Sequence, residues 1–241
     1  MMENQFDIFF RDKNYLMIKN SSFNYLNRKY HIWKEFKKYS KKDCKILDIG
    51  SGISPVSPDM KNTKFADISV DAVKFLKERG FNSEMEDITK LKEKNESYDV
   101  VLCSEVLEHV PDWEKGLKEI KRVLKKDGIA IITIPVYKKY WNIDDDFVKH
   151  VQRFEPDKFR ESAEKLGFKI IKERPIGSRA ERNLTVLIVK AFKKNSNNKI
   201  GALKARIIIS MNWILYLIVR LSVLAPNKKN TSIMLYACRK I

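Results

Sequence analysis

The sequence predicts an α/β fold: a doubly wound, mostly parallel sheet of seven strands, with N-terminal helices and a helical insertion before the last strand. An apolar run within KILDIGSGIS, residues 45–54, turns into glycine-rich backbone after Ile49, as a buried parallel strand does at its end. Short apolar runs then alternate with helical segments, which is the pattern of βαβ units. Acidic residues follow the strands, at the edge where open α/β sheets bind ligands.

The first five strands can be placed from their apolar runs and from the helix signals between them. Ser69 is a suitable N-cap for a helix over residues 69–80, and Gly80 ends that helix. A helix over residues 111–125 turns Leu117 and Ile120 toward the sheet. The expected strands are residues 46–49, 64–67, 84–88, 98–103 and 128–134.

Five segments resemble, in order, the motifs of class I S-adenosylmethionine-dependent methyltransferases: LDIGSG, ADIS, MEDI, YDVVLCSEVLEHV and LKKDGIAIITIP. The resemblance covers about residues 43–176 and is nearest to small-molecule members such as the ubiquinone-biosynthesis O-methyltransferases. It implies a methyltransferase that uses S-adenosylmethionine as its cofactor. It also implies that a strand at residues 168–176 is followed by a last, antiparallel strand at residues 232–239.

The same resemblance assigns the cofactor contacts. Asp48 and the glycine turn would hold the methionine end, and Asp67 would take the ribose hydroxyls, as an acid at the end of the second strand can. Asp87 and Ile88 would flank the adenine, while Ser104 and Glu105 would line the sulfonium side. The full set is Asp48, Gly50, Ser51, Gly52, Asp67, Ile68, Asp87, Ile88, Ser104 and Glu105.

One departure from the family pattern concerns the turn itself. Ser54 stands where the family has a third glycine, and Pro55 and Pro58 follow, so the first crossover helix is expected to start late or to be short. A NAD-binding Rossmann domain needs the complete G-x-G-x-x-G. We therefore prefer a methyltransferase to a dehydrogenase.

The long segment after the fifth strand, residues 136–156, is aromatic and charged, and it lies where parallel sheets meet substrates. Family members that act on small molecules carry a similar H-x-x-R-F signature. The alternative is that His150 and Arg153 pair with Asp144–Asp146 and only order the loop. The candidates for contact with the methyl acceptor are Tyr140, Trp141, His150 and Arg153.

Methyl transfer from a sulfonium is an in-line displacement, and a base is needed only where the nucleophile must lose a proton. Glu105, Glu108 and His109 have the i, i+3, i+4 spacing of one helix face. His109, His150 and Arg153 are the expected catalytic residues. The E-x-x-E-H set resembles a metal site of ubiquinone-biosynthesis and small-RNA methyltransferases, but similar runs occur in metal-free members, so we assign no metal ligand.

The expected organisation has four parts: an N-terminal helical cap (1–43), a methyltransferase core (44–178), an apolar and basic helical insertion (179–230) and the final strand (231–241). A helix near Tyr25–Phe36 packs beside the sheet or also covers the substrate pocket. Residues 184–192 fit a strand or a helix.

The apolar segment 203–225 is near the length of a membrane span, but Lys204, Arg206 and Arg220 interrupt it, and the last strand must return to the same sheet. We reject a span. The helix either lies in an anionic membrane interface, with residues 199–229 on the headgroups, or is buried as a lid or homodimer surface. From residue 183 onward there are eleven Lys and Arg residues and no acid, which favours the interface.

The amino-acid composition indicates which kinds of partner and which cellular compartment to expect. A net charge of +17 favours anionic partners. The three cysteines lack paired spacing, which argues against a zinc site or a disulfide framework and favours a reducing cytosol. The first residues lack a signal-peptide pattern. We expect a cytoplasmic protein that is either free in the cytosol or peripheral on the inner face of the membrane.

The function expected from these observations is methylation of a small or lipid-like acceptor, with oxygen favoured over nitrogen or carbon. The basic charge suggests an RNA or other nucleic-acid methyltransferase as an alternative. Against this alternative, SEVL replaces the D/N-P-P-Y/F run of base amino-methyltransferases. A non-catalytic regulator that binds S-adenosylmethionine is the other alternative.

Overall fold

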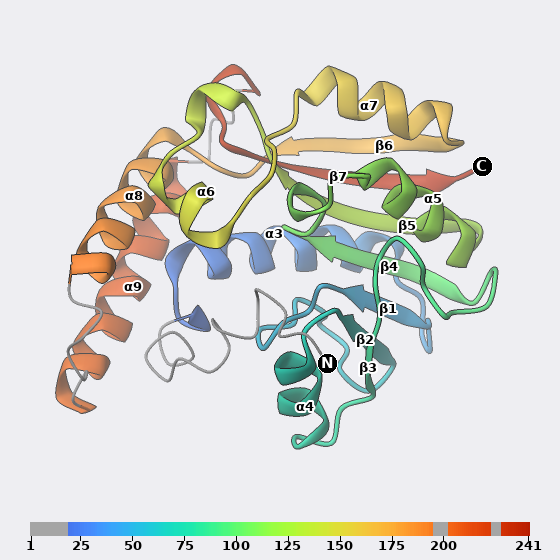
Figure 1. Cartoon of the computed structure of the whole chain (residues 1–241), viewed down its shortest axis with the longest axis horizontal. Helices are drawn as coiled ribbons and strands as arrows, with labels where there is room; N and C mark the ends of the chain where they lie inside the picture. The colour runs from blue at the N-terminus through green and yellow to red at the C-terminus, as the bar shows by residue number, and fades with distance from the viewer. Residues whose placement is uncertain (1–18, 195–201, 223–227) are drawn as a thin grey trace.

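The computed structural model describes residues 19–194, 202–222 and 228–241. Its centre is a seven-stranded sheet of order β3-β2-β1-β4-β5-β7-β6, in which only β7 runs antiparallel to its neighbours (Figure 1). The predicted fold class, a doubly wound and mostly parallel α/β sheet, is confirmed. The N-terminal part of the predicted cap, residues 1–18, lies outside the described residues.

The strands are β1 (Ile46–Ile49), β2 (Thr63–Asp67), β3 (Ser83–Met85), β4 (Tyr98–Ser104), β5 (Leu124–Pro135), β6 (Phe168–Pro175) and β7 (Ile233–Lys240). The α-helices are α3 (Phe23–Tyr39), α4 (Val70–Lys77), α5 (Trp113–Val123), α6 (Ile143–Val148), α7 (Pro156–Lys165), α8 (Arg179–Lys194) and α9 (Ala202–Ser222). Short 3-10 turns are η1 (Leu107–His109), η2 (Lys138–Tyr140) and η3 (Lys228–Asn230).

The strand register brings the carboxyl ends of the parallel strands to one edge. Ile49 pairs with Ala66 on one side and Cys103 on the other, and Ser104 pairs with Thr133. Figure 1 shows β4 and β6 pointing toward the side of the molecule where α6 and α8 lie. The acids that follow β1, β2 and β4 therefore belong to this edge, as the sequence predicted.

Helices cover both faces of the sheet, so successive strand residues are buried on opposite sides. Val101 and Cys103 join the core cluster that includes α5 and α7, whereas Val100 and Leu102 join the cluster beneath α3. Burial on both faces explains why these strands read as continuous apolar runs.

Several predicted boundaries were wrong, for local reasons. No helix forms between β1 and β2, because Pro55 and Pro58 disfavour one and the N–H groups of Val56 and Ser57 bind Asp48 instead. β5 begins at Leu124 rather than residue 128, since Leu124 already pairs with Tyr98. The ambiguous stretch 184–192 lies within the helix α8.

The insertion consists of α8 and α9. The apolar segment predicted at 203–225 is helical to Ser222, and its last three residues lie outside the described part. α9 packs against α3, where Val219 and Phe23 are both buried. Within the described chain, none of the helices combines the length and apolar character needed to cross a bilayer.

Replacing Gly50 with alanine should destabilise the fold more than replacing Gly80. Both glycines have positive φ, but an added Cβ at Gly50 would lie 2.2 Å from Val106 Cγ2, whereas Gly80 has open space. Urea unfolding should show a loss of about 2–4 kcal/mol for Gly50→Ala and about 1–2 kcal/mol for Gly80→Ala. In a Val106→Ala background, Gly50→Ala and Gly80→Ala should lower the free energy of unfolding by similar amounts. Similar losses with Val106 in place would contradict the steric explanation.

Candidate active site

The turn after β1 is shaped by its protein neighbours. Gly50 has φ +66° and donates its N–H to the Ala66 carbonyl at 2.7 Å, and Gly52 has φ +54°. Val106 fills the space in which a Cβ on Gly50 would stand. Gly50 is therefore required by its positive φ and by its packing against Val106, which follows β4. Both requirements come from the protein itself and do not depend on a ligand.

Two of the predicted acids hold this turn in place. Asp48 Oδ2 accepts hydrogen bonds from the backbone N–H groups of Val56 and Ser57, at 2.9 and 3.0 Å. Asp67 Oδ2 accepts from the Gly52 N–H at 2.7 Å. Burial raises the pKa of the Asp48 carboxyl to about 7, although the two N–H donors act in the opposite direction.

The same turn offers polar groups to a ligand. The hydroxyl groups of Ser51 and Ser54 are buried and have no hydrogen-bond partner among the residues that the structure describes. Such groups are costly unless something polar meets them. The turn therefore fits a polar ligand at the carboxyl edge of the sheet.

The remaining predicted cofactor residues fall in three surroundings. Ile68 and Asp87 are exposed, and Asp87 accepts hydrogen bonds from its neighbour Thr89. Ile88 is buried in the core, where it packs against Gly116. Ser104 lies at the end of β4, and its hydroxyl is 2.9 Å from that of Thr133.

Glu105 does not share a helix face with Glu108 and His109, so the predicted i, i+3, i+4 arrangement was wrong. The segment after β4 is a 3-10 turn preceded by Glu105 at φ +56°. Glu105 accepts from the Thr133 hydroxyl at 3.1 Å and lies 3.9 Å from Arg28 of α3. Its carboxylate is thus turned toward the helix over the sheet.

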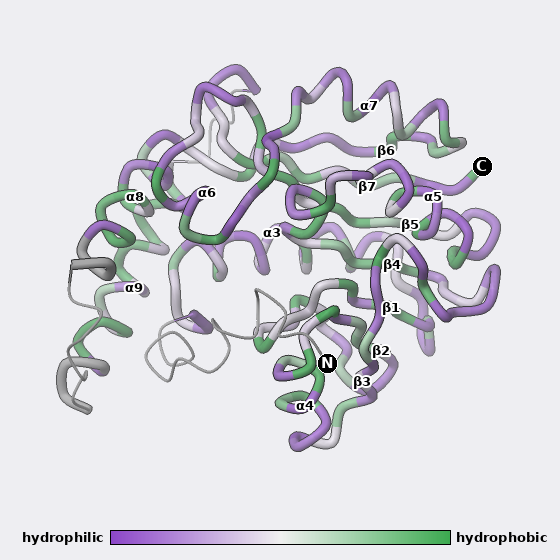
Figure 2. The backbone as a smooth tube through the Cα atoms, viewed as in Figure 1, coloured by the Kyte–Doolittle hydropathy of each residue, from purple (hydrophilic) through white to green (hydrophobic). Residues whose placement is uncertain are grey.

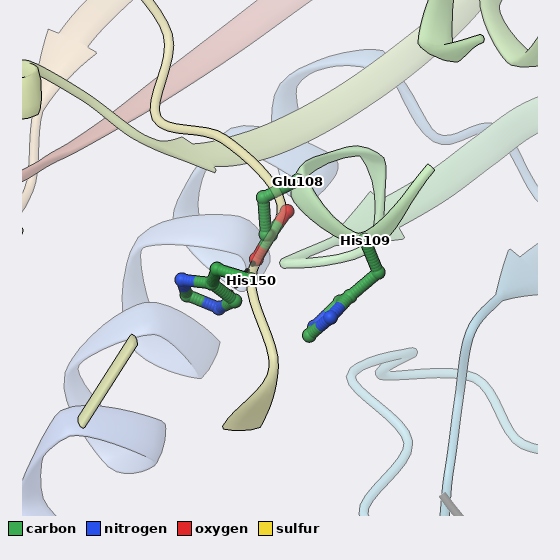
Figure 3. A group of neighbouring side chains, drawn as sticks. All are labelled: Glu108, His109 and His150. Atoms are coloured by element: carbon green, nitrogen blue, oxygen red, sulfur yellow. Dashed lines mark ion pairs between the residues drawn. The ribbon is translucent and has the colours of Figure 1, made fainter. Parts of the chain in front are cut away.

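Glu108 and His109 meet His150 instead, as Figure 3 shows. One donor atom from each of the three lies within 4.8 Å of the others, and His150 Nε2 is 3.6 Å from Glu108 Oε1. The Glu108 carboxyl is fully buried and forms no hydrogen bond with the described part of the chain, and burial raises its pKa well above the usual range. Burial, together with His150, lowers the pKa of His109 to about 4.

Asp145 joins the substrate-side candidates. Its carboxylate accepts from His150 Nδ1 at 2.7 Å, from Arg153 at 2.7 and 3.1 Å, and from Arg182 at 3.0 Å. Burial would raise the Asp145 pKa, but the His150 hydrogen bond and the charge of Arg153 hold it below its usual value. His150 and Arg153 do pair with the acidic segment, as the alternative reading of the sequence stated, and their catalytic roles stay predictions.

The two aromatic candidates lie beside this network. The Trp141 indole N–H donates to Asp146 at 2.8 Å, and the Tyr140 carbonyl accepts from Arg182 Nε at 2.9 Å. A cavity of about 520 Å³ opens here. It is lined by Lys139, Tyr140, Trp141, Asn142, Arg182, Asn183, Val186 and Leu187.

Helix α3 covers the turn after β1 as well as the sheet. The Tyr25 hydroxyl donates to the Pro55 carbonyl at 3.0 Å, and the Trp33 indole N–H donates to the Val56 carbonyl at 2.8 Å. Arg28 lies between these two residues in sequence and faces Glu105. The helix predicted to pack beside the sheet therefore also reaches the candidate site.

Sequence reasoning missed Arg28, Glu181 and Arg182. Glu181 is buried at the start of α8, accepts from Asn27 at 3.4 Å, and has a pKa raised by burial to about 8. One signal was available: Glu181 is the last acid in the chain, directly before the long basic tail.

Comparison with known proteins finds sequence similarity in the central part of the chain. Residues 47–132 match a family described as a methyltransferase domain. Over 99 residues the chain is 39% identical to an uncharacterized protein of Methanocaldococcus jannaschii, covering 39% of this chain and 42% of that protein. Over 130 residues it is 26% identical to the ubiquinone biosynthesis O-methyltransferase of Rickettsia conorii, covering 49% and 45%. The chain thus spans less than half of the length of these curated relatives.

Among solved structures, the fold is similar to phosphoethanolamine N-methyltransferase 2 of Haemonchus contortus, crystallised in complex with S-adenosyl-L-methionine. The TM-score is 0.60 at 18% identity, over 89% of this chain and 52% of that one. This likeness shows the fold.

The buried Asp48 should make stability depend on pH in a way that Asp48→Asn removes. Its folded pKa of about 7 exceeds the ordinary value of 3.8, so its contribution is present below about pH 4 and is lost as the pH rises through 7. Between pH 4 and 7 the free energy of unfolding should fall less in Asp48→Asn, by at most about 4 kcal/mol.

Urea unfolding at several pH values measures this difference. Asp59 is a suitable control, because hydrogen bonding from Asn62 lowers its pKa and its contribution is lost as the pH falls. Asp59→Asn should not reduce the decline toward pH 7. An unchanged decline in Asp48→Asn would exclude Asp48 as its source.

Proposed function

We propose that the chain is a class I S-adenosylmethionine-dependent methyltransferase and that it transfers a methyl group to a small or lipid-like acceptor, with oxygen as the receiving atom. The observation that carries the proposal is the turn after β1, in which Gly52 is fixed by Asp67 at the carboxyl edge of the sheet. Nucleoside cofactors bind at this edge in open α/β sheets.

The residues of the turn fit this cofactor. The Ser51 and Ser54 hydroxyls are buried without hydrogen-bond partners in residues 19–194, 202–222 and 228–241, so a polar ligand supplies the partners that they lack there. Asp67 already accepts from Gly52 and Ser69, but each carboxylate oxygen can accept a second hydrogen bond. Asp67 can thus keep the turn in place while it binds ribose hydroxyls. When bound, S-adenosylmethionine supplies an activated methyl group on a sulfonium.

His109 is the candidate for the base that oxygen acceptors need, on account of its place beside Glu108 and His150. Its pKa, lowered to about 4 by burial and by His150, keeps the imidazole neutral near pH 7 but also makes it a weak base, so it suits an acceptor with an acidic hydroxyl. The Asp145 hydrogen bond fixes the orientation of the neighbouring His150 ring. We infer that His109 accepts the acceptor's proton, while Asp145, through His150 and Arg153, keeps this side of the site rigid.

The cavity beside Arg182 supports a partly apolar acceptor. Its wall combines Trp141, Val186 and Leu187 with the cations Lys139 and Arg182. Arg182 also binds Asp145, which holds His150, so the cavity wall is linked to the histidine pair by two contacts. An acceptor with an apolar body and an anionic or polar head matches this lining.

Glu108, His109 and His150 also fit a divalent cation. A buried carboxylate without a hydrogen bond to the described residues and two imidazoles are a donor set for Zn²⁺ or Mn²⁺. Asp145 binds the far nitrogen of His150, as outer carboxylates do in such sites. With a cation bound, His109 would be a ligand and not a base, and the cation would instead lower the pKa of an acceptor hydroxyl.

Cofactor binding should depend on Asp67. Asp67→Asn keeps an oxygen for the Gly52 N–H but loses the charge that favours ribose hydroxyls, so calorimetric titration with S-adenosylhomocysteine should show binding weaker by about 1–3 kcal/mol. Glu78→Gln, an exposed change directly after α4, should bind normally. Unchanged affinity in Asp67→Asn would exclude its ribose role.

Transfer of a labelled methyl group from S-adenosylmethionine tests the acceptor class. Wild-type protein should label a lipid extract and not RNA, and Asp67→Asn should label less at limiting cofactor. Labelled RNA would instead support a nucleic-acid methyltransferase. Cofactor binding without any labelled product would support the regulator alternative.

Metal binding should require the three clustered side chains. Equilibrium dialysis with Mn²⁺ should give stoichiometric binding for wild type and at least about tenfold weaker binding for Glu108→Gln or His150→Ala. The Glu84, Glu86 and Glu93 group is a control, because the Lys64 amine already lies among those acids, and Glu84→Gln should bind as wild type does. Equal binding by all variants would exclude this site.

A further inference from the structure

Helix α9 exposes seven large apolar side chains to the solvent. Its polar residues Asn212 and Arg220 point inward: Asn212 is buried, and the Arg220 guanidinium stacks 3.4 Å from the Tyr30 ring of α3. The outward residues are 48 to 67% exposed. They are Ile207, Met211, Trp213, Ile214, Leu217, Ile218 and Leu221.

This exposure is concentrated in one place. Of the fifteen exposed large hydrophobic residues in the described part of the chain, seven lie on α9 and two, Leu187 and Ile188, lie on α8. Figure 2 shows hydrophobic stretches along both helices, which stand beside the body of the molecule. We call these nine residues the α8–α9 face. Contiguous apolar surface of this kind marks an interaction site.

Charge complementarity indicates what covers the face. From residue 183 to the end, eleven Lys and Arg residues occur without a single Asp or Glu. Lys190 and Arg206, one on each helix, are exposed near the apolar residues. In the described part of α8 and α9 the exposed charged residues, Arg179, Lys190 and Arg206, are all cations. An apolar surface that carries cations and no exposed acid is complementary to a layer that is apolar inside and anionic at its boundary.

The breadth of the apolar strip also bears on the occupant. At about 100° per residue, the outward apolar positions of α9 span roughly 160° of its circumference. A two-helix seam uses a narrower strip of about two residues in seven. A second copy on a twofold axis would also place the same basic border against itself. Both arguments favour an extended anionic surface over a second copy of the chain.

We propose that the α8–α9 face docks this protein on an anionic membrane surface, with the axis of α9 in the interface and without a span. The apolar side chains enter the headgroup boundary, and Trp213 lies at the depth that indole rings prefer. Leu187 belongs both to this face and to the lining of the cavity beside Arg182. Docking therefore brings the cavity next to the lipid, although the docking itself does not depend on methyl transfer.

Vesicle co-sedimentation tests the proposal with the full chain. Wild-type protein should sediment with phosphatidylcholine vesicles that contain phosphatidylglycerol, and less with phosphatidylcholine alone or at high salt. The double variant Ile214→Glu, Leu217→Glu should partition at least about tenfold less. The control double variant Val70→Glu, Met85→Glu changes exposed apolar residues away from the face, 42 and 44% exposed against 60% for Ile214 and Leu217, and should sediment as wild type does.

Two further measurements separate the outcomes. Titration with S-adenosylhomocysteine should be equal for wild type and both double variants, which shows that the variants are folded and keeps this test apart from the methyl-transfer proposal. Lys190→Gln with Arg206→Gln should weaken sedimentation mainly at low salt.

The proposal is overturned if wild-type protein does not sediment with anionic vesicles, or if the control double variant loses as much vesicle binding as the α9 variant. A wild-type dimer that the α9 variant converts to monomer, without vesicle binding, would assign the face to a second copy.

Discussion

The hydrogen bond from the Gly52 N–H to Asp67 is the contact on which the candidate site depends. It ties the turn after β1 to the end of β2, while Asp48 ties the continuation of that turn back to β1 through Val56 and Ser57. The usual helix after the first strand is absent, so these side chains replace helical hydrogen bonds for the turn. The acids first interpreted as ligand contacts thus also hold the structure, and one carboxylate can serve both purposes because it accepts more than one hydrogen bond.

The parts of the fold that follow from local pattern were predictable. The strands 46–49 and 98–103 could be placed because burial on both faces leaves an apolar run, and the final antiparallel strand followed from the family resemblance. Asp145 could not be assigned as the partner of both His150 and Arg182, since Arg182 lies 37 residues farther along the chain. It belongs to α8, and from the sequence residues 184–192 of that helix fitted a strand equally well. Long-range contacts of this kind depend on how the insertion docks, and no local pattern records that.

The segment after β4 shows a different limit. Spacing of i, i+3 and i+4 implies a shared face only if the backbone is helical, and here Glu105 has a positive φ while residues 107–109 form a 3-10 turn. The turn separates Glu105, which faces Arg28, from Glu108 and His109, which face His150. Glu105, Glu108 and His109 are close in the sequence but line two different sides of the candidate site. The residues that complete each wall come from α3 and from the loop after α6.

The surroundings of α9 explain why its sequence is apolar all the way round the helix. Its hydrophobic residues surround the helix because two different environments require them: Val219 packs on α3, and Leu217 and Leu221 face outward. A pattern that tests for one apolar face cannot separate these two demands. The inward Arg220 is accommodated by stacking on Tyr30, so its charge is no obstacle to packing and no sign of the solvent side. What distinguishes the outward face is that 48 to 67% of each residue is exposed in the described chain, together with a tail that lacks acids, and an anionic lipid surface satisfies both conditions at once.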